Sequence, residues 1–454
     1  MSQPALISFV EKPPVSSPNN YVFYVWNCRS FSYIHVKDYK LIYPDIPSFL
    51  QNNAFYLRLV NFGYNKIDKK RFKRENSMNI SVSQPNLAQA LSIVSHAVSS
   101  RSTLTILENI LISTEEDRIC LSATNLELGL RYWIPAQIEQ EGSITVPAKM
   151  FTDLVNTMPA DTVNLVLNEI NQTVTVRCQK LVTEIRGIEA SEFPPMPEYD
   201  EAEGVPFEMP EMKKMIQQVS FAAAVDDNRP VLHGVKMSVN GNILAMAATD
   251  GYRIAIKKII LKEGLPNPVS AIIPASALRE LARITNANDK VVHMAFCGEK
   301  SQVIFHLENA ELISSLIAGE FINYEAIIPT SFKTTTVVST AALQSACNQA
   351  GVIARENKNL IKMNIRISDD DMAKIIIMTQ AEQSGGSQEN VVEANAQGED
   401  IQIAFNVRYL KDVLDVIDSP NVSLRTNATM SPAMITPLDD QIDYKYVIMP
   451  MHFA

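Results

Sequence analysis

SQPNLAQALSIVSHAV (83–98) is the first of three similar stretches that decide the fold, and it is followed by MPEMKKMIQQVSFAAA (209–224) and STAALQSACNQAGVIA (339–354). In the first stretch, apolar residues recur every three or four positions from Leu87 to Val98. This spacing is typical of a helix that buries one face. Each stretch therefore predicts an amphipathic helix at the start of a repeat.

Each stretch is followed by the same two features in the same order. A threonine in a strand-like run lies 39 residues after Pro85, Pro210 and Thr340, at Thr124, Thr249 and Thr379. A second amphipathic run comes 23, 25 or 27 residues later, at PAKMFTDLVNTM (147–158), PASALRELARIT (274–285) and NVRYLKDVLDVI (406–417). Proline, or asparagine ahead of a helical run, suits a helix start.

The repeat predicts an α+β chain of three like domains, each with two helices backed by antiparallel sheets. We expect boundaries near 205 and 330, at DEAEGVP and IIPTSFK, because the repeats meet there. The domains then cover residues 78–205, 206–330 and 331–454.

Residues 1–77 form a leader of different character, whose structure the sequence does not predict. They carry 15 of the 33 aromatic residues and end in the basic run KIDKKRFKREN. The leader is either a flexible basic arm or a segment absent from the native protein. The codons for residues 73–75 can contain an AGGAG-type ribosome-binding sequence, so we expect translation to start at Met78.

Charge and composition narrow the classes of function. The net charge is −10, and the leader is basic, so residues 78–454 hold 29 Lys and Arg against 45 Asp and Glu. Such a balance argues against nucleic-acid binding unless the basic residues gather on one surface. The chain has neither an apolar run of about 20 residues nor a basic signal-peptide start, which predicts a cytoplasmic protein. Five cysteines without a C-x-x-C pair predict reduced thiols.

Motifs for catalysis and cofactor binding are absent, so we expect neither an enzyme nor a cofactor. The best enzyme alternative is a metal or acid/base site made of Asp226, Asp227, His233 and Asp250. The simpler interpretation is a polar loop and a strand-to-turn junction, because no second His or Cys lies nearby in sequence.

Basic residues recur on the expected helices, at Lys149, Lys213, Lys214, Arg279, Arg283, Arg408 and Lys411. Arg279 and Arg283 are four residues apart, so they share one helix face. These residues are either ordinary solvated helix faces or one basic surface repeated in each domain. The repeat favours the second interpretation.

Seven segments in order resemble the beta subunit of bacterial DNA polymerase III, the sliding clamp family, over essentially all of 78–454. They are MNISVSQPNLAQAL, SRSTLTILENILI, ATNLEL, EFP (192–194), ATDGYRIA, FNVRYLKDVLDVI and YVIMPMHFA. The resemblance implies the DNA-clamp fold and a head-to-tail homodimer, whose ring of six domains is lined by twelve helices. Helices about 9 to 10 Å apart leave a bore of roughly 25 Å, enough for duplex DNA. Arg101 matches a DNA-contacting position of the family, so it joins the basic helix residues as a DNA-binding candidate.

The resemblance also implies partners and two further sets of residues. The partners are the DNA polymerase III catalytic subunit, the clamp loader and other proteins with a clamp-binding motif. The implied peptide pocket comprises Leu232, Thr249, Gly251, Tyr252, Arg253, Ile254, Ile327, Val447, Met449, Pro450 and Met451. The implied dimer contact lies near Val182 and Ile185 on one side and Val352 and Ile353 on the other.

The pocket positions depart from the family pattern in places. Tyr252 stands where the family often has His, and Ile322 replaces the usual Pro after Phe321. A clamp paralogue that no longer binds polymerase therefore stays open as an alternative.

Overall fold

A computed structural model describes residues 20–27, 30–37, 78–99, 102–199, 204–225, 228–262, 264–265, 267–286, 288–297, 301–368, 372–381, 385–439 and 442–453. The chain divides into two compact units, residues 1–75 and 76–454. In the first unit, β1 (Asn20–Asn27) and β2 (Ser30–Lys37) pair as an antiparallel hairpin, with Asn20 opposite Lys37. The second unit holds the threefold repeat.

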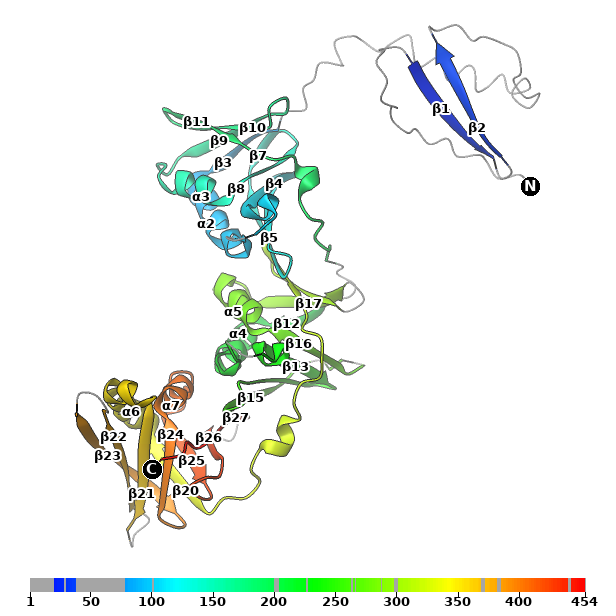
Figure 1. The fold of residues 1–454 in the computed structure, drawn as a ribbon. Coiled ribbons are helices and arrows are strands. Elements are labelled where there is room, and N and C mark those ends of the chain that lie inside the picture. Colours follow the sequence, from blue (N-terminus) through cyan, green and yellow to red (C-terminus); the bar gives the residue numbers. More distant parts are fainter. Residues whose placement is uncertain are drawn as a thin grey trace. The chain divides into compact units, whose positions relative to one another are not determined.

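Domain 1 contains two helices among short strands (Figure 1). Its strands are β3 (Asn79–Ser83), β4 (Asn109–Glu115), β5 (Arg118–Thr124), β6 (Leu128–Pro135), β7 (Gln137–Gln140), β8 (Ser143–Pro147), β9 (Thr162–Asn168), β10 (Thr173–Cys178) and β11 (Leu181–Arg186). Its helices are α2 (Gln84–Val94) and α3 (Ala148–Asn156), with the short 3-10 helices η2 (Ser95–Ala97), η3 (Thr105–Glu108) and η4 (Ala190–Glu192).

Domain 2 repeats this order of elements, except that none of its described strands corresponds to β7. Its strands are β12 (Val205–Glu208), β13 (Gly234–Asn240), β14 (Ile243–Thr249), β15 (Arg253–Ile260), β16 (Val269–Pro274), β17 (Val291–Cys297), β18 (Gln302–His306) and β19 (Ala310–Ser315). Its helices are α4 (Met209–Val219) and α5 (Ala275–Ile284), with η6 (Ser220–Ala222), η7 (Pro230–His233) and η8 (Tyr324–Ile327).

Domain 3 repeats the order once more. Its strands are β20 (Thr334–Ser339), β21 (Leu360–Ile367), β22 (Met372–Gln380), β23 (Ser387–Gln397), β24 (Ile401–Asn406), β25 (Asn421–Thr426), β26 (Ala433–Pro437) and β27 (Tyr444–Ile448). Its helices are α6 (Thr340–Ala354) and α7 (Val407–Leu414), with η9 (Arg355–Asn357). The predicted fold class, with two helices per repeat backed by antiparallel strands, is confirmed.

Local sequence explains where four of the six described helices begin. Proline occupies the first turn of α2 and of α4, where its missing N–H costs no helical hydrogen bond. The side chains of Ser339 and Asn406 accept hydrogen bonds from backbone N–H groups in the first turns of α6 and α7. In each domain the two helices contact each other and bury their apolar faces in one shared core.

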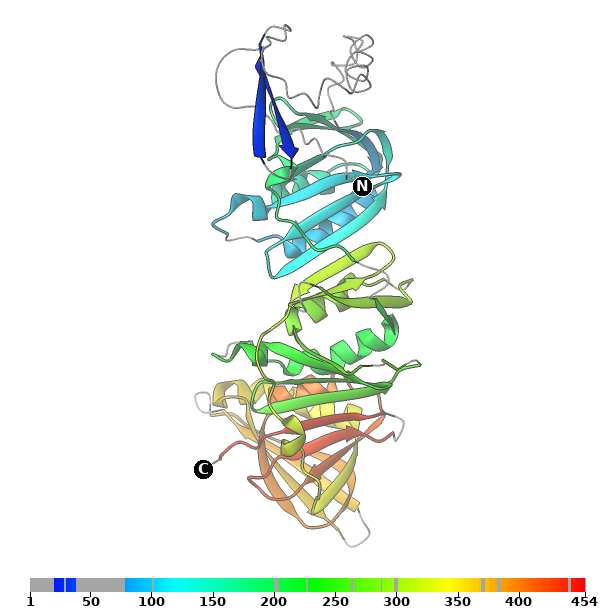
Figure 2. The ribbon, with the colours of Figure 1, turned by 90° about the vertical axis from the view of Figure 1, so that its right-hand side faces the viewer.

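Sheets continue from one domain into the next (Figure 2). β6 of domain 1 pairs antiparallel with β19 of domain 2, which makes an eight-stranded sheet. β15 of domain 2 pairs in the same way with β27 of domain 3, within a twelve-stranded sheet. The two domain junctions therefore use equivalent strands, namely the third strand after the first helix and the last strand of the next domain.

The linkers between the domains pack on the sheet face away from the helices. After domain 1, Phe193 and Met196 form a small cluster with Leu107 beside the sheet. After domain 2, Tyr324 of η8 packs with Ile254 and Ile256 of β15. Each linker thus covers part of the outer sheet face at its junction.

Candidate nucleic-acid and peptide interfaces

The basic residues of the helix pairs differ in how much of their charge is compensated. Lys149, at the start of α3, is exposed. On α4, the Nζ of Lys214 lies 2.7 Å from an Asp418 carboxylate oxygen. Arg283 of α5 is paired with Glu280, one turn earlier on the same helix. Charge for a polyanion is therefore less available at Lys214 and Arg283 than at Lys149.

In domains 1 and 2 the fifth residue of the second helix reaches the end of the first helix. In domain 1 the hydroxyl of Thr152 lies 3.3 Å from that of Ser95. In domain 2 the Nη1 of Arg279 donates to the carbonyl oxygen of Ser220 at 2.9 Å, and burial lowers the pKa of this guanidinium. Lys213 of α4 similarly donates to the Thr285 carbonyl oxygen at 3.3 Å. The helix pairs therefore present equivalent positions in successive domains.

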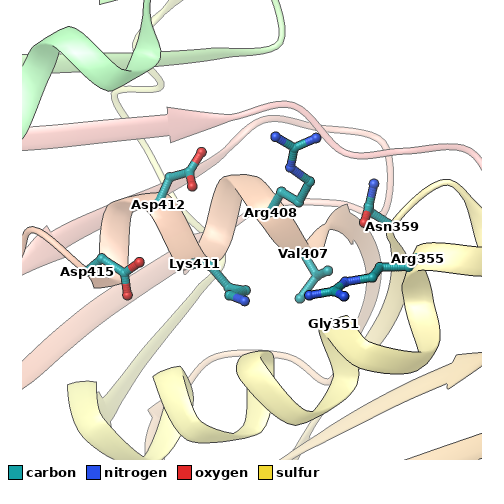
Figure 3. A pocket seen from close by; sticks show the side chains of 8 residues that line it. All are labelled: Gly351, Arg355, Asn359, Val407, Arg408, Lys411, Asp412 and Asp415. Atoms are coloured by element: carbon teal, nitrogen blue, oxygen red, sulfur yellow. The ribbon is translucent and has the colours of Figure 1, made fainter.

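A cavity of about 500 Å³ lies between α6 and α7 in domain 3 (Figure 3). Arg408 and Lys411 of α7 line it together with Arg355 of η9, and Asp412 and Asp415 also contribute. The side chains of Lys411 and Arg355 point into the space between the helices. Sequence reasoning missed Arg355, because it follows the amphipathic stretch that predicted α6. This cluster of three cations is a candidate phosphate-binding surface.

Arg253 links domain 2 to domain 3. Its guanidinium bonds Asp250 at 3.0 Å, Asp412 of α7 at 2.5 Å and the Phe221 carbonyl oxygen at 3.0 Å. It also lies over the Tyr409 ring at 4.3 Å from the centroid. Burial alone would lower its pKa, but the neighbouring Tyr446, Asp412 and Asp250 raise the pKa above its ordinary value. The side chain is buried, so its role in the structure is to join the two domains.

The other predicted pocket residues divide into a buried and an exposed group. The buried ones are Leu232, Thr249, Ile254 and Val447. Thr249 closes the turn that follows β14, since its hydroxyl donates to the Arg253 carbonyl oxygen and accepts from the N–H of Gly251. Gly251 has a φ of +90°, a conformation that favours glycine.

The exposed group offers apolar surface at the same junction. Tyr252 is 65% exposed, Ile327 41% and Met449 38%. The N–H of Met449 donates to the Tyr252 carbonyl oxygen at 2.8 Å, so these two residues are neighbours. Pro450 follows, half-buried, and the N–H of Met451 donates to the Ala404 carbonyl oxygen at 2.8 Å. The C-terminal segment is thereby held on domains 2 and 3.

An ion-pair cluster at the junction of domains 1 and 2 was not predicted. The buried Glu311 of β19 accepts from Arg131 of β6 at 3.0 Å, and its other oxygen lies 2.9 Å from the Nδ1 of His306. Burial would raise the pKa of Glu311, but the hydrogen bonds with His306 and Arg131 bring its pKa below the ordinary value. No sequence pattern within β6 or β19 indicates that Arg131 and Glu311 pair across the junction.

The predicted dimer residues lie on β11 and near the end of α6. Val182 is 61% exposed and Val352 63% exposed, whereas Ile185 is buried in the core of domain 1 and Ile353 is half-buried. In the chain itself, only the two valines thus present large apolar area at these positions.

Several predicted residues fall outside the described part of the chain: Arg101, Asp226, Asp227, Cys28 and the leader apart from its hairpin. His233 lies in η7 and Asp250 in the turn before β15. Within the described ranges, no group of three or more His, Cys, Asp or Glu residues could hold a metal ion. Cys120, Cys178 and Cys347 are free thiols. None of the helices in this part is long and apolar enough to cross a membrane.

Comparison with known proteins matches the chain to one family along its repeats. The N-terminal domain of the DNA polymerase III beta subunit matches residues 78–197, the central domain 207–323 and the C-terminal domain 325–452. The beta sliding clamp of Synechococcus elongatus is 30% identical over 371 residues, which cover 81% of this chain and 97% of the relative. The beta sliding clamp of Bacillus subtilis is 28% identical and covers 80% and 97%.

Solved structures give the same result. The crystal structure of the Bacillus subtilis sliding clamp is 27% identical with a TM-score of 0.78, and covers 83% of this chain and all of that chain. The Pseudomonas aeruginosa sliding clamp bound to griselimycin is 26% identical with a TM-score of 0.75 and the same coverage. The chain belongs to the DNA polymerase III beta subunit family, the bacterial sliding clamps.

Proposed function

We propose that two copies of the chain join head to tail into a ring that encircles duplex DNA in the cytoplasm and tethers the replicative polymerase, without catalysis. One observation supports this proposal. The same strand pairing joins the domains twice within the chain, and one further strand of each of the two equivalent kinds, one in domain 1 and one in domain 3, has an edge that no described strand covers. A third and equivalent pairing would close a ring of two chains.

These edges, which no described strand covers, belong to β11 and to the first part of β23. β11, the last strand of domain 1, is equivalent to β19 and β27 and forms one end of its sheet. β23 is equivalent to β6 and β15, and among the described strands its residues 387–393 pair on one side only, with β22. Uncovered strand edges with apolar side chains favour pairing with another chain. β11 of one protomer would therefore pair with β23 of its partner.

The helices support the same contact. His96, Phe221 and Val352 each lie twelve residues after the first residue of their helix. His96 meets Glu280 of α5 across the first junction, at 3.6 Å. Phe221 lies against Tyr446 of domain 3 at the second junction. Val352 has the corresponding place in domain 3, so its exposed side chain would be covered by domain 1 of the partner.

An acidic position completes the pattern. Glu280 and Asp412 are each the sixth residue of their helix, and each carboxylate lies close to a side-chain nitrogen of the preceding domain, of His96 and Arg253 respectively. The equivalent residue of α3 is Asp153, which is exposed and forms no ion pair with the described residues. This carboxylate would face domain 3 of the partner.

DNA would contact the helix pairs through Lys149, Lys213, Lys214, Arg279, Arg283, Arg408 and Lys411, with Arg101 and the newly found Arg355. Contacts with phosphates are independent of base sequence, as a sliding protein requires. Since the ring itself would retain the DNA, each contact can be weak. Lys214 and Arg283 would contribute least, because carboxylates of the chain compensate their charge.

Removing three of these cations tests the DNA surface. The triple substitution Arg355→Gln, Arg408→Gln and Lys411→Gln is expected to weaken binding of a short duplex about tenfold or more at low salt. The slope of log affinity against log salt should also become shallower by roughly 0.9 per lost contact. Fluorescence anisotropy across a salt series measures both quantities.

The matched control removes the same charge elsewhere in domain 3, by Lys333→Gln, Arg366→Gln and Lys374→Gln. These residues lie on or beside strands away from the α6–α7 cavity. An equal loss in both triple variants would mean that net charge, and not this surface, governs DNA binding.

Polymerase and other partners would bind the apolar surface formed by Tyr252, Ile327 and Met449. Apolar area contributes about 25 cal/mol per Å² when it is covered, and methionine adapts to differently shaped ligands. Micromolar affinity is expected, which suits partners that exchange on one ring. Arg253, Thr249 and the buried pocket residues would act by shaping this surface.

Truncating two residues tests the peptide surface. The double substitution Tyr252→Ala and Met449→Ala is expected to weaken binding of a labelled clamp-binding peptide from the polymerase catalytic subunit by about thirtyfold or more. Fluorescence polarisation measures this affinity. Ile260→Ala, at the far end of β15 and 76% exposed, is the control and should bind normally. If the unsubstituted chain fails to bind the peptide, it is instead a clamp paralogue without a polymerase.

A further inference from the structure

A second cavity, of about 430 Å³, lies on domain 1 beside its junction with domain 2. Cys120 and Ser122 of β5 line it, whereas the alternating Ile119 and Leu121 belong to the core beneath α2. Successive strand residues point to opposite faces of a sheet. The cavity therefore opens on the sheet face away from the helices, and the proposed DNA surface does not include it.

The repeat relates this cavity to the apolar peptide surface. Phe193 and Phe321 each follow a glutamate in the linker behind their domain, and each packs on the outer side of the sheet. The turns after β5 and β14 also correspond, since Leu126 and Gly251 both have positive φ, at 75° and 90°. The two junctions thus hold equivalent sites whose linings differ in chemistry.

Aromatic rings and carboxylates line the cavity at this first junction. Glu115 of β4 accepts from the Trp133 indole N–H at 2.8 Å, through one of its two oxygens. Glu198, in the linker, is exposed and forms no ion pair with any described residue. Next to it, Tyr199 stacks on His306, with ring centroids 4.4 Å apart.

The single cation in the lining cannot balance these acids. Arg131 is already taken up by Glu311 and by the carbonyl oxygens of Pro197 and Met196. Glu198 and the second carboxylate oxygen of Glu115 therefore remain available to a cation that enters the cavity. A guanidinium is attracted both by the face of an aromatic ring and by a carboxylate.

At the rim of the cavity, an arginine of the chain itself already contacts both an aromatic ring and a carboxylate. The Arg118 guanidinium lies 5.4 Å from the Trp133 ring centroid, and its Nη2 is 3.7 Å from the Glu115 carboxylate. The pair is about half exposed, so Arg118 can move without breaking a buried contact. Phe193 and Met196 add apolar area beside the acids.

We infer that this cavity binds an arginine side chain presented by a short extended segment of a partner protein, with an apolar neighbour resting on the linker. The proposal depends neither on ring closure nor on the peptide surface at the second junction. A partner could therefore occupy the apolar surface and the acidic cavity with two different segments.

Labelled pentapeptides test the inference on the full chain. The probe is Gly-Leu-Arg-Leu-Gly, and the same peptide with citrulline in place of arginine keeps the shape but removes the charge. Fluorescence polarisation gives the affinity, and the ¹⁵N-indole resonance of Trp133 reports the site. We expect the arginine peptide to shift this resonance and to bind about tenfold more tightly than the citrulline peptide.

Two matched pairs of substitutions locate the charge. Glu115→Gln with Glu198→Gln should weaken the arginine peptide about tenfold, while the glutamine at 115 keeps an acceptor for Trp133. Glu116→Gln with Glu192→Gln removes the same charge from exposed residues outside the lining and should change the affinity less than twofold. The inference is overturned if the citrulline peptide binds as tightly as the arginine peptide, or if both pairs of substitutions weaken binding equally. It is also overturned if the Trp133 resonance does not shift at about 10 mM arginine peptide, a concentration at which a site of millimolar affinity would be mostly occupied.

Discussion

Replacing Arg253 with methionine is expected to lower the free energy of unfolding by about 3 to 5 kcal/mol. The substitution keeps much of the apolar stem but leaves the carboxylates of Asp250 and Asp412 without their cation. The Arg253 and Asp250 side chains are only 9% and 14% exposed, so water cannot fully replace the lost contacts. Urea unfolding followed by circular dichroism measures the change, and calorimetry identifies the domains that melt early.

Arg366→Met is the matched control, because it breaks an ion pair of similar geometry at the surface. The Nη1 of Arg366 lies 2.9 Å from Asp400, but its side chain is 63% exposed. Exposed pairs contribute less than about 1 kcal/mol, so the control should be nearly as stable as the parent chain. A similar loss in both variants would show that Arg253 does not hold domains 2 and 3 together.

Placing charge on both halves of the proposed ring contact is expected to turn the proposed dimer into monomers. In the double variant Val182→Glu and Val352→Glu, each interface would have to bury two carboxylates without partners. Burying these carboxylates would cost about 3 kcal/mol at each of the two interfaces in a ring. The affinity of the two chains for each other would therefore fall roughly ten-thousandfold. Sedimentation velocity at micromolar concentration measures the mass.

The control places the same charges on apolar residues that lie outside the proposed contact. Ile170, in the turn after β9, is 89% exposed and Ile260 76% exposed, so Ile170→Glu with Ile260→Glu should leave the dimer intact. A Val182 and Val352 double variant that remains dimeric would place the contact elsewhere on the chain.

Sequence patterns predicted the helices well because their cause is local. The apolar spacing in 83–98 follows from the way a helix buries one face, and α2 with η2 occupies that stretch. The pairing of β15 with β27 was beyond such reasoning. It joins Arg253 to Ile448 in register, and no periodicity within a strand encodes the identity of a partner almost 200 residues away.

In the candidate sites, too, local features could be predicted from the sequence and long-range contacts could not. The family resemblance placed Thr249 and residues 251–254 in a peptide pocket, but neighbouring residues of this run have different roles, which only the packing decides. Tyr252 lies on the surface, whereas Arg253 is buried against Tyr409 and Asp412. Arg355 was not predicted because it lies just beyond the end of α6, where the helical spacing of apolar residues no longer applies. Pairs that are local, such as Glu280 with Arg283, can be read from the sequence because they are three residues apart.

Retention on circular DNA tests the central claim, that the chain closes around the duplex. The protein would be loaded onto a nicked circular plasmid by the clamp loader proposed as its partner, and then washed at about 0.5 M salt to remove binding that depends on charge alone. The bound protein would be measured before and after the plasmid is cut once. A closed ring predicts that the protein stays on the circle and leaves the linear DNA by sliding off its ends. Equal retention on both forms, or loss from both in the salt wash, would contradict encirclement.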